Sequence, residues 1–257
     1  MKKIDLNNNE IINQIYQDVV DFHTHILPEM DDGSSSLTET TKMLKTMNDQ
    51  GISTVIATPH FYPQEETPES FLARRRKACE KLLCEYDPVL YPKIYLGAEV
   101  AYFSGIGRSR YVKDLVIEGT NVILVEMPFT EWSDSVISEI YCLRETLGLI
   151  PIIAHYERYI GRQKRGMLKK LCANGALIQS NAGHFIDLKD GKKAVRAFCK
   201  GDIQLLGTDC HNMTVRVPNL HGALSLIAQH KDGVAMLEEM LSLQEFLLSG
   251  AISIENI

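Results

Sequence analysis

The sequence of 257 residues lacks several features that mark specialised classes of protein. No window approaches the roughly 18 consecutive apolar residues of a membrane-spanning helix. The opening stretch 1–18 has two lysines but is too polar for the apolar part of a secretory signal. The six cysteines are scattered without a C-x-x-C pair, which is typical of reduced thiols rather than of a disulfide framework. These absences predict a soluble cytoplasmic protein without an integral membrane segment.

An excess of positive charge is also missing. Acidic residues number 33 against 27 basic ones, a formal net charge of −6, so the chain is not built to hold nucleic acid by bulk charge. No G-x-G-x-x-G or G-x-x-x-x-G-K-[ST] loop follows a predicted strand, which removes the signature of the common nucleotide-binding folds. What is present is 45% hydrophobic residues, enough for an ordered core of ordinary size.

Seven short apolar runs, rich in β-branched residues, indicate buried strands. They span residues 19–23, 53–60, 94–100, 121–127, 151–156, 176–181 and 203–211. Helical spacing lies between them, at 37–48, 68–86, 134–147, 163–173 and 189–200, with a weaker turn at 109–117. This alternation predicts an α/β fold of parallel strands joined by right-handed crossovers, either a closed barrel or an open sheet.

Nothing in the sequence marks a boundary between two domains. There is no Pro/Gly/Ser-rich linker, low-complexity tract or short repeat. We therefore expect an N-terminal extension over 1–18 and a single domain over 19–257. The Leu-rich tail after Pro218 is predicted to be helical and to cover the outside of the barrel.

Titratable side chains gather where the predicted strands end. Five of the eight histidines and four acidic residues stand there: His23, His25, His60, His155 and His211, with Asp21, Glu99, Glu126 and Asp209. In a barrel of parallel strands these ends converge on one face, where such folds carry their chemistry. Burying so many ionisable groups without ions to pair them is unfavourable. The pattern therefore predicts a metal centre.

The His23-x-His25 pair sharpens this prediction, because alternate residues of a strand point the same way and both rings can reach one ion. Imidazole with carboxylate suits Mn²⁺, Fe²⁺, Zn²⁺ or Mg²⁺ in a site that keeps open positions. About eight or nine ligands are too many for one ion, so we expect two or three ions, roughly 3.5–4 Å apart as in bimetallic hydrolases.

Six motifs along the chain carry a family resemblance. They are H-x-H, Thr-Pro-His60, Gly-Ala-Glu99, Val-Glu126, Ala-His155 and Asp209-x-His211. From about Val19 to Asn219 the sequence resembles the PHP (polymerase and histidinol phosphatase) family. Within it, DFHTHILPEMDDGSSSLTET and TPHFYP look like the bacterial manganese-dependent protein-tyrosine phosphatases of the CpsB/CapC type. The resemblance implies a single-domain, distorted (β/α)7 TIM-like barrel.

The resemblance also implies which residues bind metal. It assigns His23, His25, Glu99 and Asp209 to a first ion, a bridging Glu99 with Glu126 and His155 to a second, and Asp32, His60 and His211 to a third. Asp31 competes with Asp32 for its place, and D-D-G is otherwise a common turn. The implied metal is Mn²⁺.

Two arginines stand where the family contacts the substrate phosphate, Arg158 in HYER and Arg216 in HNMTVR. A guanidinium offers phosphate oxygens a bidentate fork. The implied reaction is hydrolysis of phosphotyrosine by a metal-activated hydroxide, with the third ion or His60 assisting the departing phenolate. The implied partner is an autophosphorylated bacterial tyrosine kinase that controls capsule or exopolysaccharide synthesis. Tyr156, in place of an expected proline, and His184 depart from the family pattern.

Other functions stay open at this point. A phosphatase acting on histidinol phosphate or another small phosphomonoester would use the same ligands. An exonuclease is disfavoured because the acidic chain lacks a basic, aromatic-bearing surface, and a metal-bound partner protein without activity is the non-enzymatic alternative. Cys210 and Arg216 have the C-x5-R spacing of cysteine-dependent phosphatases. CHNMTVR, however, has no glycine for a loop that cradles phosphate, so we attribute this match to chance.

Overall fold

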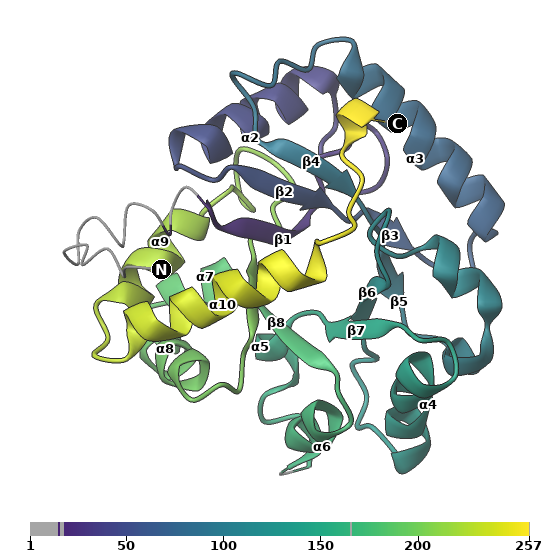
Figure 1. Cartoon of the computed structure of the whole chain (residues 1–257), viewed down its shortest axis with the longest axis vertical. Helices are drawn as coiled ribbons and strands as arrows, with labels where there is room; N and C mark the ends of the chain where they lie inside the picture. Colours follow the sequence, from purple (N-terminus) through teal and green to yellow (C-terminus); the bar gives the residue numbers. More distant parts are fainter. Residues whose placement is uncertain (1–14, 16–17, 165, 257) are drawn as a thin grey trace, which may run out of the picture.

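The computed structural model describes residues 15, 18–164 and 166–256, so most of the predicted extension 1–18 lies outside the described residues. The chain has an α/β fold in which a curled sheet lies centrally and helices surround it (Figure 1). Every pair of neighbouring strands in this sheet is parallel, as the alternation of strands and helices predicts. No helix within the described ranges is long and apolar enough to cross a membrane.

Each predicted strand run contains at least one strand. The strands are β1 (Val20–Thr24), β2 (Thr54–Ala57), β3 (His60–Phe61), β4 (Lys93–Leu96), β5 (Glu99–Ala101), β6 (Val122–Glu126), β7 (Ile150–Ile153), β8 (Leu177–Asn181) and β9 (Leu205–Gly207). The run 53–60 divides into β2 and β3 at Pro59, which has no backbone N–H to offer a neighbour. Its neighbour, the run 94–100, divides into β4 and β5 at the same level.

Hydrogen bonds connect the two groups of strands. Their orders are β1-β2-β4 and β3-β5-β6-β7-β8-β9. The Gly97 N–H donates to the Ala57 carbonyl (2.8 Å), and the Glu99 N–H donates to the Pro59 carbonyl (3.0 Å), so the two divided runs stay side by side. Beyond β9, the Asp209 N–H donates to the His23 carbonyl (2.8 Å). The carboxyl ends of β1 and β9 therefore lie together, although they are far apart in the sequence.

Five helices correspond to predicted ones: α2 (Leu37–Asp49), α3 (Pro68–Leu83), α4 (Asp134–Glu145), α6 (Met167–Ala173) and α8 (Gly191–Cys199). Ser36 caps α2 by accepting from the Glu39 N–H, and Thr67 caps α3, which then begins with proline. The weak turn at 109–117 forms the 3₁₀ helix η2 (Arg110–Asp114), after η1 (Ile106–Arg108). The sequence does not predict α5 (Tyr156–Tyr159) or α7 (Ala182–Ile186), which are too short to show a helical period.

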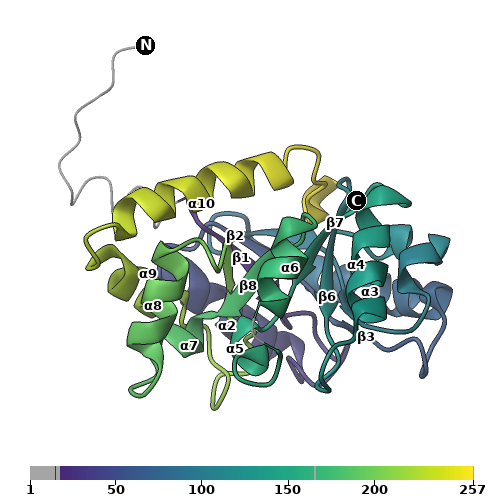
Figure 2. The ribbon, with the colours of Figure 1, turned by 90° about the horizontal axis from the view of Figure 1, so that it is seen from below.

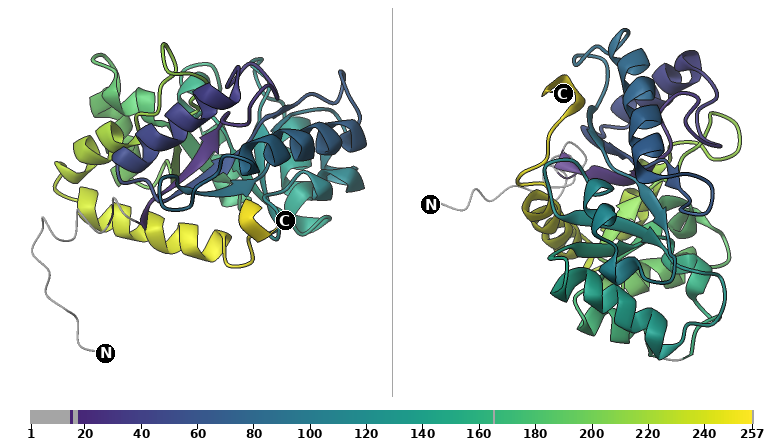
Figure 3. Two further views of the ribbon diagram at one scale, coloured as in Figure 1. Left: turned by 90° about the horizontal axis from the view of Figure 1, so that it is seen from above. Right: turned by 90° about the vertical axis from the view of Figure 1, so that its right-hand side faces the viewer.

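The predicted helical tail forms α9 (Leu220–Ala228), α10 (Gly233–Leu247) and the 3₁₀ helix η3 (Ile254–Asn256). α10 lies across the face at which the strands begin, opposite the face with α5 and α7 (Figures 2 and 3). Its buried Gln244 accepts from the Val20 N–H (3.1 Å) and donates to the Val20 carbonyl (3.2 Å). The tail therefore covers the amino ends of the strands, and their carboxyl ends stay on the opposite side.

Candidate metal centre

A buried cluster of imidazoles and carboxylates lies at the carboxyl ends of the strands. The nine side chains that the sequence analysis named as ligands all fall into groups whose atoms lie within 4.8 Å of one another: His25, Asp32, His60 and His211; His23, Glu99 and His155; His23, His25 and Asp209; His60, Glu99 and Glu126. Shared members join these groups into one centre. Side chains from position 23 to position 211 are thus brought together by the parallel arrangement of the strands.

Four atoms converge in the deepest part of the centre. His23 Nε2 and His25 Nε2 are 3.2 Å apart, and both face Glu99 Oε2 (3.2 and 3.4 Å) and Asp209 Oδ1 (3.6 and 3.4 Å). Ligands held about 2.0–2.2 Å from one ion lie roughly 3.0–3.6 Å from each other. Glu99 Oε2 and Asp209 Oδ1 are buried and accept no hydrogen bond from any described residue. The donor set and its spacing fit a divalent cation.

Two further sets lie beside this one. His155 Nε2 is 2.6 Å from Glu99 Oε1 and 3.7 Å from Glu126 Oε1. Glu99 therefore directs one oxygen to each of two neighbouring sets, as a bridging carboxylate does. On the other side, Asp32 Oδ1 is 3.3 Å from both His60 Nε2 and His211 Nε2.

Four of the histidines have an acceptor for their Nδ1–H, so that Nε2 faces the centre. Asp31 Oδ2 accepts from His25 (2.7 Å), and the Asp209 carbonyl accepts from His211 (2.9 Å). Side-chain amides of β8 accept from the other two: Gln179 Oε1 from His23 Nδ1 (3.4 Å), and Asn181 Oδ1 from His155 Nδ1 (3.2 Å). In metal-binding histidines a partner on one ring nitrogen commonly orients the ring so that the other nitrogen can reach the ion.

The orientation of the two amides follows from their own contacts. Asn181 Nδ2 donates to Asp209 Oδ2 (2.8 Å), so its oxygen is the atom that faces His155. Gln179 Nε2 donates to Asn181 Oδ1 (3.1 Å). Gln179 Oε1 is therefore the atom that accepts from the His155 backbone N–H (3.1 Å) and faces His23 Nδ1. One pair of amides thereby contacts candidate ligands at the carboxyl ends of three strands, β1, β7 and β9. The sequence analysis missed both, although the alternate spacing of Q-S-N at a strand end places them on one face.

Asp31 and Asp32, which the sequence leaves as competitors, have different surroundings. Asp31 is buried and accepts from His25 Nδ1 and from the backbone N–H groups of His60 and Gly33 (both 2.9 Å). Asp32 is 66% exposed and faces His60 and His211. A Cβ on Gly33 would lie 2.3 Å from the His25 carbonyl oxygen, so only glycine lets this turn fold back over the strand.

Close packing and unusual backbone angles surround the ligands. His155 and Asp209 have φ values of 61° and 54°, a left-handed conformation that side chains other than glycine rarely adopt. A Cβ on Gly207 would lie 2.5 Å from the His23 Cβ, so β9 approaches β1 closely where the ligands begin.

Burial alone would raise the pKa of Glu99, but His23 and His155 outweigh it and hold that pKa well below its ordinary value. The central carboxylate is therefore ionised.

Arg158 and Arg216 reach the cluster from its rim. Both guanidinium groups contact Asp209 Oδ2, and Arg158 also contacts Glu126. Arg216 Nη1 donates to His211 Nε2 (2.8 Å). The Arg158 side chain is 28% exposed and that of Arg216 is 36% exposed. The two guanidinium groups thus lie between the carboxylates and solvent, where they can bind an anion.

Comparison with known proteins decides the family. Residues 19–244 match the model of the family described as "Capsular polysaccharide synthesis, CpsB/CapC". The chain belongs to this family. It is 30% identical over 234 residues to the tyrosine-protein phosphatase YwqE of Bacillus subtilis, and the aligned region covers 87% of this chain and 89% of YwqE. It is 27% identical over 229 residues to the tyrosine-protein phosphatase CpsB of Streptococcus agalactiae, and the aligned region covers 82% of this chain and 90% of CpsB.

A solved structure of the same family shares the fold. It is described as coming from work on YwqE from Bacillus subtilis and CpsB from Streptococcus pneumoniae, "unique metal-dependent tyrosine phosphatases". The superposition has a TM-score of 0.76 at 24% sequence identity and covers 91% of this chain and 96% of the other. The curled α/β architecture is therefore that of CpsB/CapC proteins.

Three other residues singled out in the sequence lie outside the groups of potential metal ligands. Asp21 is buried and accepts from the Thr208 N–H (2.8 Å) and hydroxyl (2.6 Å), so it ties β1 to the end of β9. Cys210 is fully buried, and burial raises the pKa of its thiol well above the ordinary value, which argues against a thiolate nucleophile. His184 on α7 contacts the Ser180 hydroxyl (3.2 Å).

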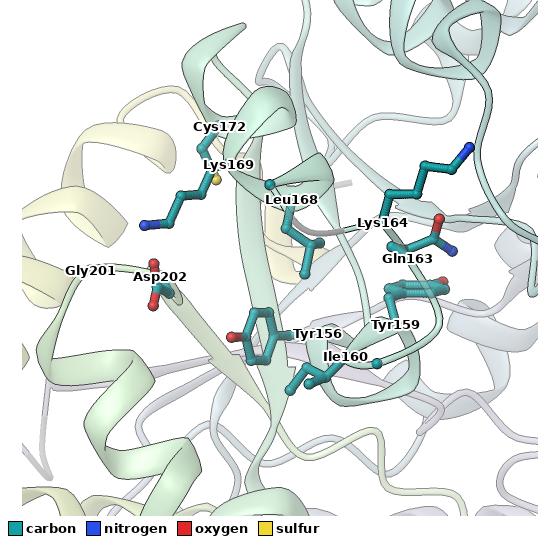
Figure 4. A pocket seen from close by; sticks show the side chains of 12 residues that line it. Tyr156, Tyr159, Ile160, Gln163, Lys164, Leu168, Lys169, Cys172, Gly201 and Asp202 are labelled. Atoms are coloured by element: carbon teal, nitrogen blue, oxygen red, sulfur yellow. The ribbon is translucent and has the colours of Figure 1, made fainter.

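Tyr156, which stands where the sequence analysis expected proline, belongs to a separate cavity. This cavity of about 530 Å³ is also lined by Lys169 and Asp202, and the Tyr156 phenol points into it (Figure 4). Arg158, two residues further along α5, still reaches Glu126. The tyrosine therefore changes the wall behind α5 without removing the arginine from the cluster.

Proposed function

We propose that this CpsB/CapC-family protein is a metal-dependent protein-tyrosine phosphatase. The observation that carries the proposal is the convergence of two buried oxygens, Glu99 Oε2 and Asp209 Oδ1, on the Nε2 atoms of His23 and His25, with two arginines at the rim. Neither oxygen accepts a hydrogen bond from the part of the chain that the structure describes. The relatives named tyrosine-protein phosphatases support the reaction class. The metal dependence of the tyrosine phosphatases YwqE and CpsB, whose fold this chain shares, supports the dependence on metal.

The proposed ions are Mn²⁺, two or three in number, with Fe²⁺, Mg²⁺ or Zn²⁺ as alternatives. The proposed ligand sets are His23, His25, Glu99 and Asp209; Glu99, Glu126 and His155; and Asp32, His60 and His211. When bound, such ions supply Lewis-acid stabilisation of the phosphoryl oxygens and lower the pKa of water toward about 7. The Nδ1 acceptors described above orient four of the imidazoles so that Nε2 faces the proposed ions.

The chain's own residues bind and orient the substrate. Arg158 and Arg216 exchange part of their contacts with Glu126 and Asp209 for the equatorial oxygens of the phosphate, in bidentate geometry. His60, whose side chain is 12% exposed, has Nε2 on the side of the exposed Asp32. In one alternative it would hold, with Asp32 and His211, a third ion that would stabilise the phenolate that leaves. In the other, with no ion there, a protonated His60 would donate its Nε2 proton to that phenolate.

Several finer features belong to the same proposal. The links from β2 to β3, from β4 to β5 and from β9 back to β1 support a closed (β/α)7 barrel of the PHP type. The pairing of Gln244 with Val20 supports one domain over 19–257. The proposed substrate is an autophosphorylated bacterial tyrosine kinase that controls capsule or exopolysaccharide synthesis, and the proposed place of action is the cytoplasm.

A substrate panel tests the reaction. The full chain, freed of metal by chelation and then reloaded with Mn²⁺, is given a phosphotyrosyl peptide, the same peptide with phosphoserine, and histidinol phosphate. We expect activity only after reloading, with the highest kcat/KM on phosphotyrosine. Equal kcat/KM on all three would contradict the tyrosine phosphatase, and a preference for histidinol phosphate would favour the small-molecule alternative. Activity that survives chelation would contradict the metal mechanism.

A further inference from the structure

Phe129 is an exposed aromatic residue next to one of the two arginines of the centre. It lies in the segment that follows β6, on the carboxyl face, and it is 52% exposed. The Cζ atom of Arg158 is 5.7 Å from its ring centroid and that of Arg162 is 5.9 Å away. The Tyr159 ring is 6.4 Å away. The ring is therefore supported by its neighbours although more than half of it faces solvent, a state that favours contact with a ligand.

Tyr62 is a second aromatic residue at the centre, just after β3. Its ring stacks on His60 with centroids 5.1 Å apart and an angle of 27° between the planes. No described residue forms a hydrogen bond with the Tyr62 hydroxyl in this structure. Its packing onto His60 places a flat aromatic surface beside the centre.

Glu126 joins the surroundings of the two aromatic residues. It contacts the guanidinium of Arg158, which packs against Phe129, and it falls into one group of potential ligands with His60, on which Tyr62 stacks. An anion held by Arg158 and Arg216 would thus have one aromatic ring near Arg158 and another near His60. A phosphate monoester with an aromatic leaving group can pack against such rings, whereas an alkyl leaving group offers no face for stacking.

We propose that Phe129 and Tyr62 contact the aromatic ring of the substrate and give the site its preference for aryl over alkyl phosphate monoesters. This inference rests on the proposed function, because it takes the phosphate to be held by Arg158 and Arg216. It adds the residues that distinguish phosphotyrosine from phosphoserine after the shared phosphate contacts are made.

The experiment compares two peptides that differ only in phosphotyrosine or phosphoserine. We expect Phe129→Ala to lower kcat/KM for the phosphotyrosyl peptide by about three- to tenfold, the usual range for one aromatic contact, and to leave the phosphoseryl peptide unchanged. Tyr62→Ala should act in the same way. Phe129→Tyr and Tyr62→Phe keep the rings and should keep the preference.

Matched controls come from exposed aromatic residues elsewhere. Phe246 on α10 is 65% exposed and Tyr141 on α4 is 41% exposed, so Phe246→Ala and Tyr141→Ala should change neither peptide. If Phe129 only positions Arg158, Phe129→Ala will weaken both peptides by the same factor, because both phosphates use that arginine. Such an equal loss would overturn the inference.

A binding measurement separates this inference from the proposed function. Calorimetry with peptides carrying non-hydrolysable phosphonate analogues of phosphotyrosine and phosphoserine needs no turnover. Phe129→Ala should weaken the aryl analogue about three- to tenfold and spare the alkyl one. Wild-type protein that hydrolyses neither natural peptide would refute the phosphatase. The binding ratio of the two analogues would still decide the role of Phe129 and Tyr62, and an unchanged ratio would reject it.

Discussion

Replacing Asp31 by asparagine changes one atom in a carboxylate that accepts three hydrogen bonds. Asp31 Oδ2 accepts from His25 Nδ1 and the His60 N–H, and Oδ1 accepts from the Gly33 N–H. An amide has only one oxygen, so either rotamer places its NH₂ group against a donor. The rotamer that keeps the contacts to His25 and His60 places the new NH₂ group against the Gly33 N–H. The neutral amide also removes the negative charge beside the His25 imidazole.

The expected magnitude follows from these contacts. A buried donor without an acceptor costs about 1–3 kcal/mol, so Asp31→Asn should lower the free energy of unfolding of the metal-free protein by about that amount. Loss of the charged partner of a ligating imidazole typically lowers metal affinity about 10–100-fold. We therefore expect both a lower urea midpoint and a weaker Mn²⁺ titration in calorimetry.

The neighbouring Asp32 supplies the matched control. Its side chain is exposed and contacts two imidazoles but no backbone N–H, so Asp32→Asn should change the free energy of unfolding by less than about 0.5 kcal/mol. It should still remove part of the Mn²⁺ binding. If Asp31→Asn left stability and affinity unchanged, or if Asp32→Asn destabilised the fold as much, the distinction drawn between these two carboxylates would be refuted.

Three more outcomes are expected. Arg216→Ala should raise KM for a phosphotyrosyl peptide roughly tenfold or more with metal content near wild type by elemental analysis, and loss of metal would argue against a phosphate contact. Gly207→Ala should lower the free energy of unfolding by about 1–3 kcal/mol and weaken Mn²⁺ binding, because the new Cβ meets His23; an unchanged urea midpoint would contradict this. Burial, then His25 and Arg216, lower the pKa of His211 to about 4, so the folded state resists its protonation. Metal-free protein should lose stability as pH falls from about 6.5, where the unfolded side chain titrates, toward 4, and His211→Asn should lessen this loss in urea titrations at each pH.

Much of the architecture could be predicted because it depends on short-range patterns. The apolar runs and the spacing between them give the order of parallel strands, and that order alone brings His23, His155 and His211 to one face. The ends of long helices follow from caps such as Ser36 and Thr67. The short helices α5 and α7 contain too few residues to show a period, and they are set by the loops that surround them.

Other parts of the centre depend on contacts that no local pattern reveals. Asp31 and Asp32 are adjacent acids in one turn, and the close approach of Gly33 to His25 determines which of them points inward. Gln179 and Asn181 are neutral, so a search for ionisable residues at strand ends passes over them. Their importance appears only when β8 is placed between the strands that carry His155 and Asp209.

The pairing of Gln244 with Val20 has a consequence for biosynthesis. The two residues are 224 positions apart, so β1 gains these two backbone partners only after α10 has been made. Contacts of such long range slow folding, and chains are made from the amino end. The nascent protein therefore carries His23 and His25 through the synthesis of the whole interval from Val20 to Gln244 before β1 can gain these two hydrogen bonds.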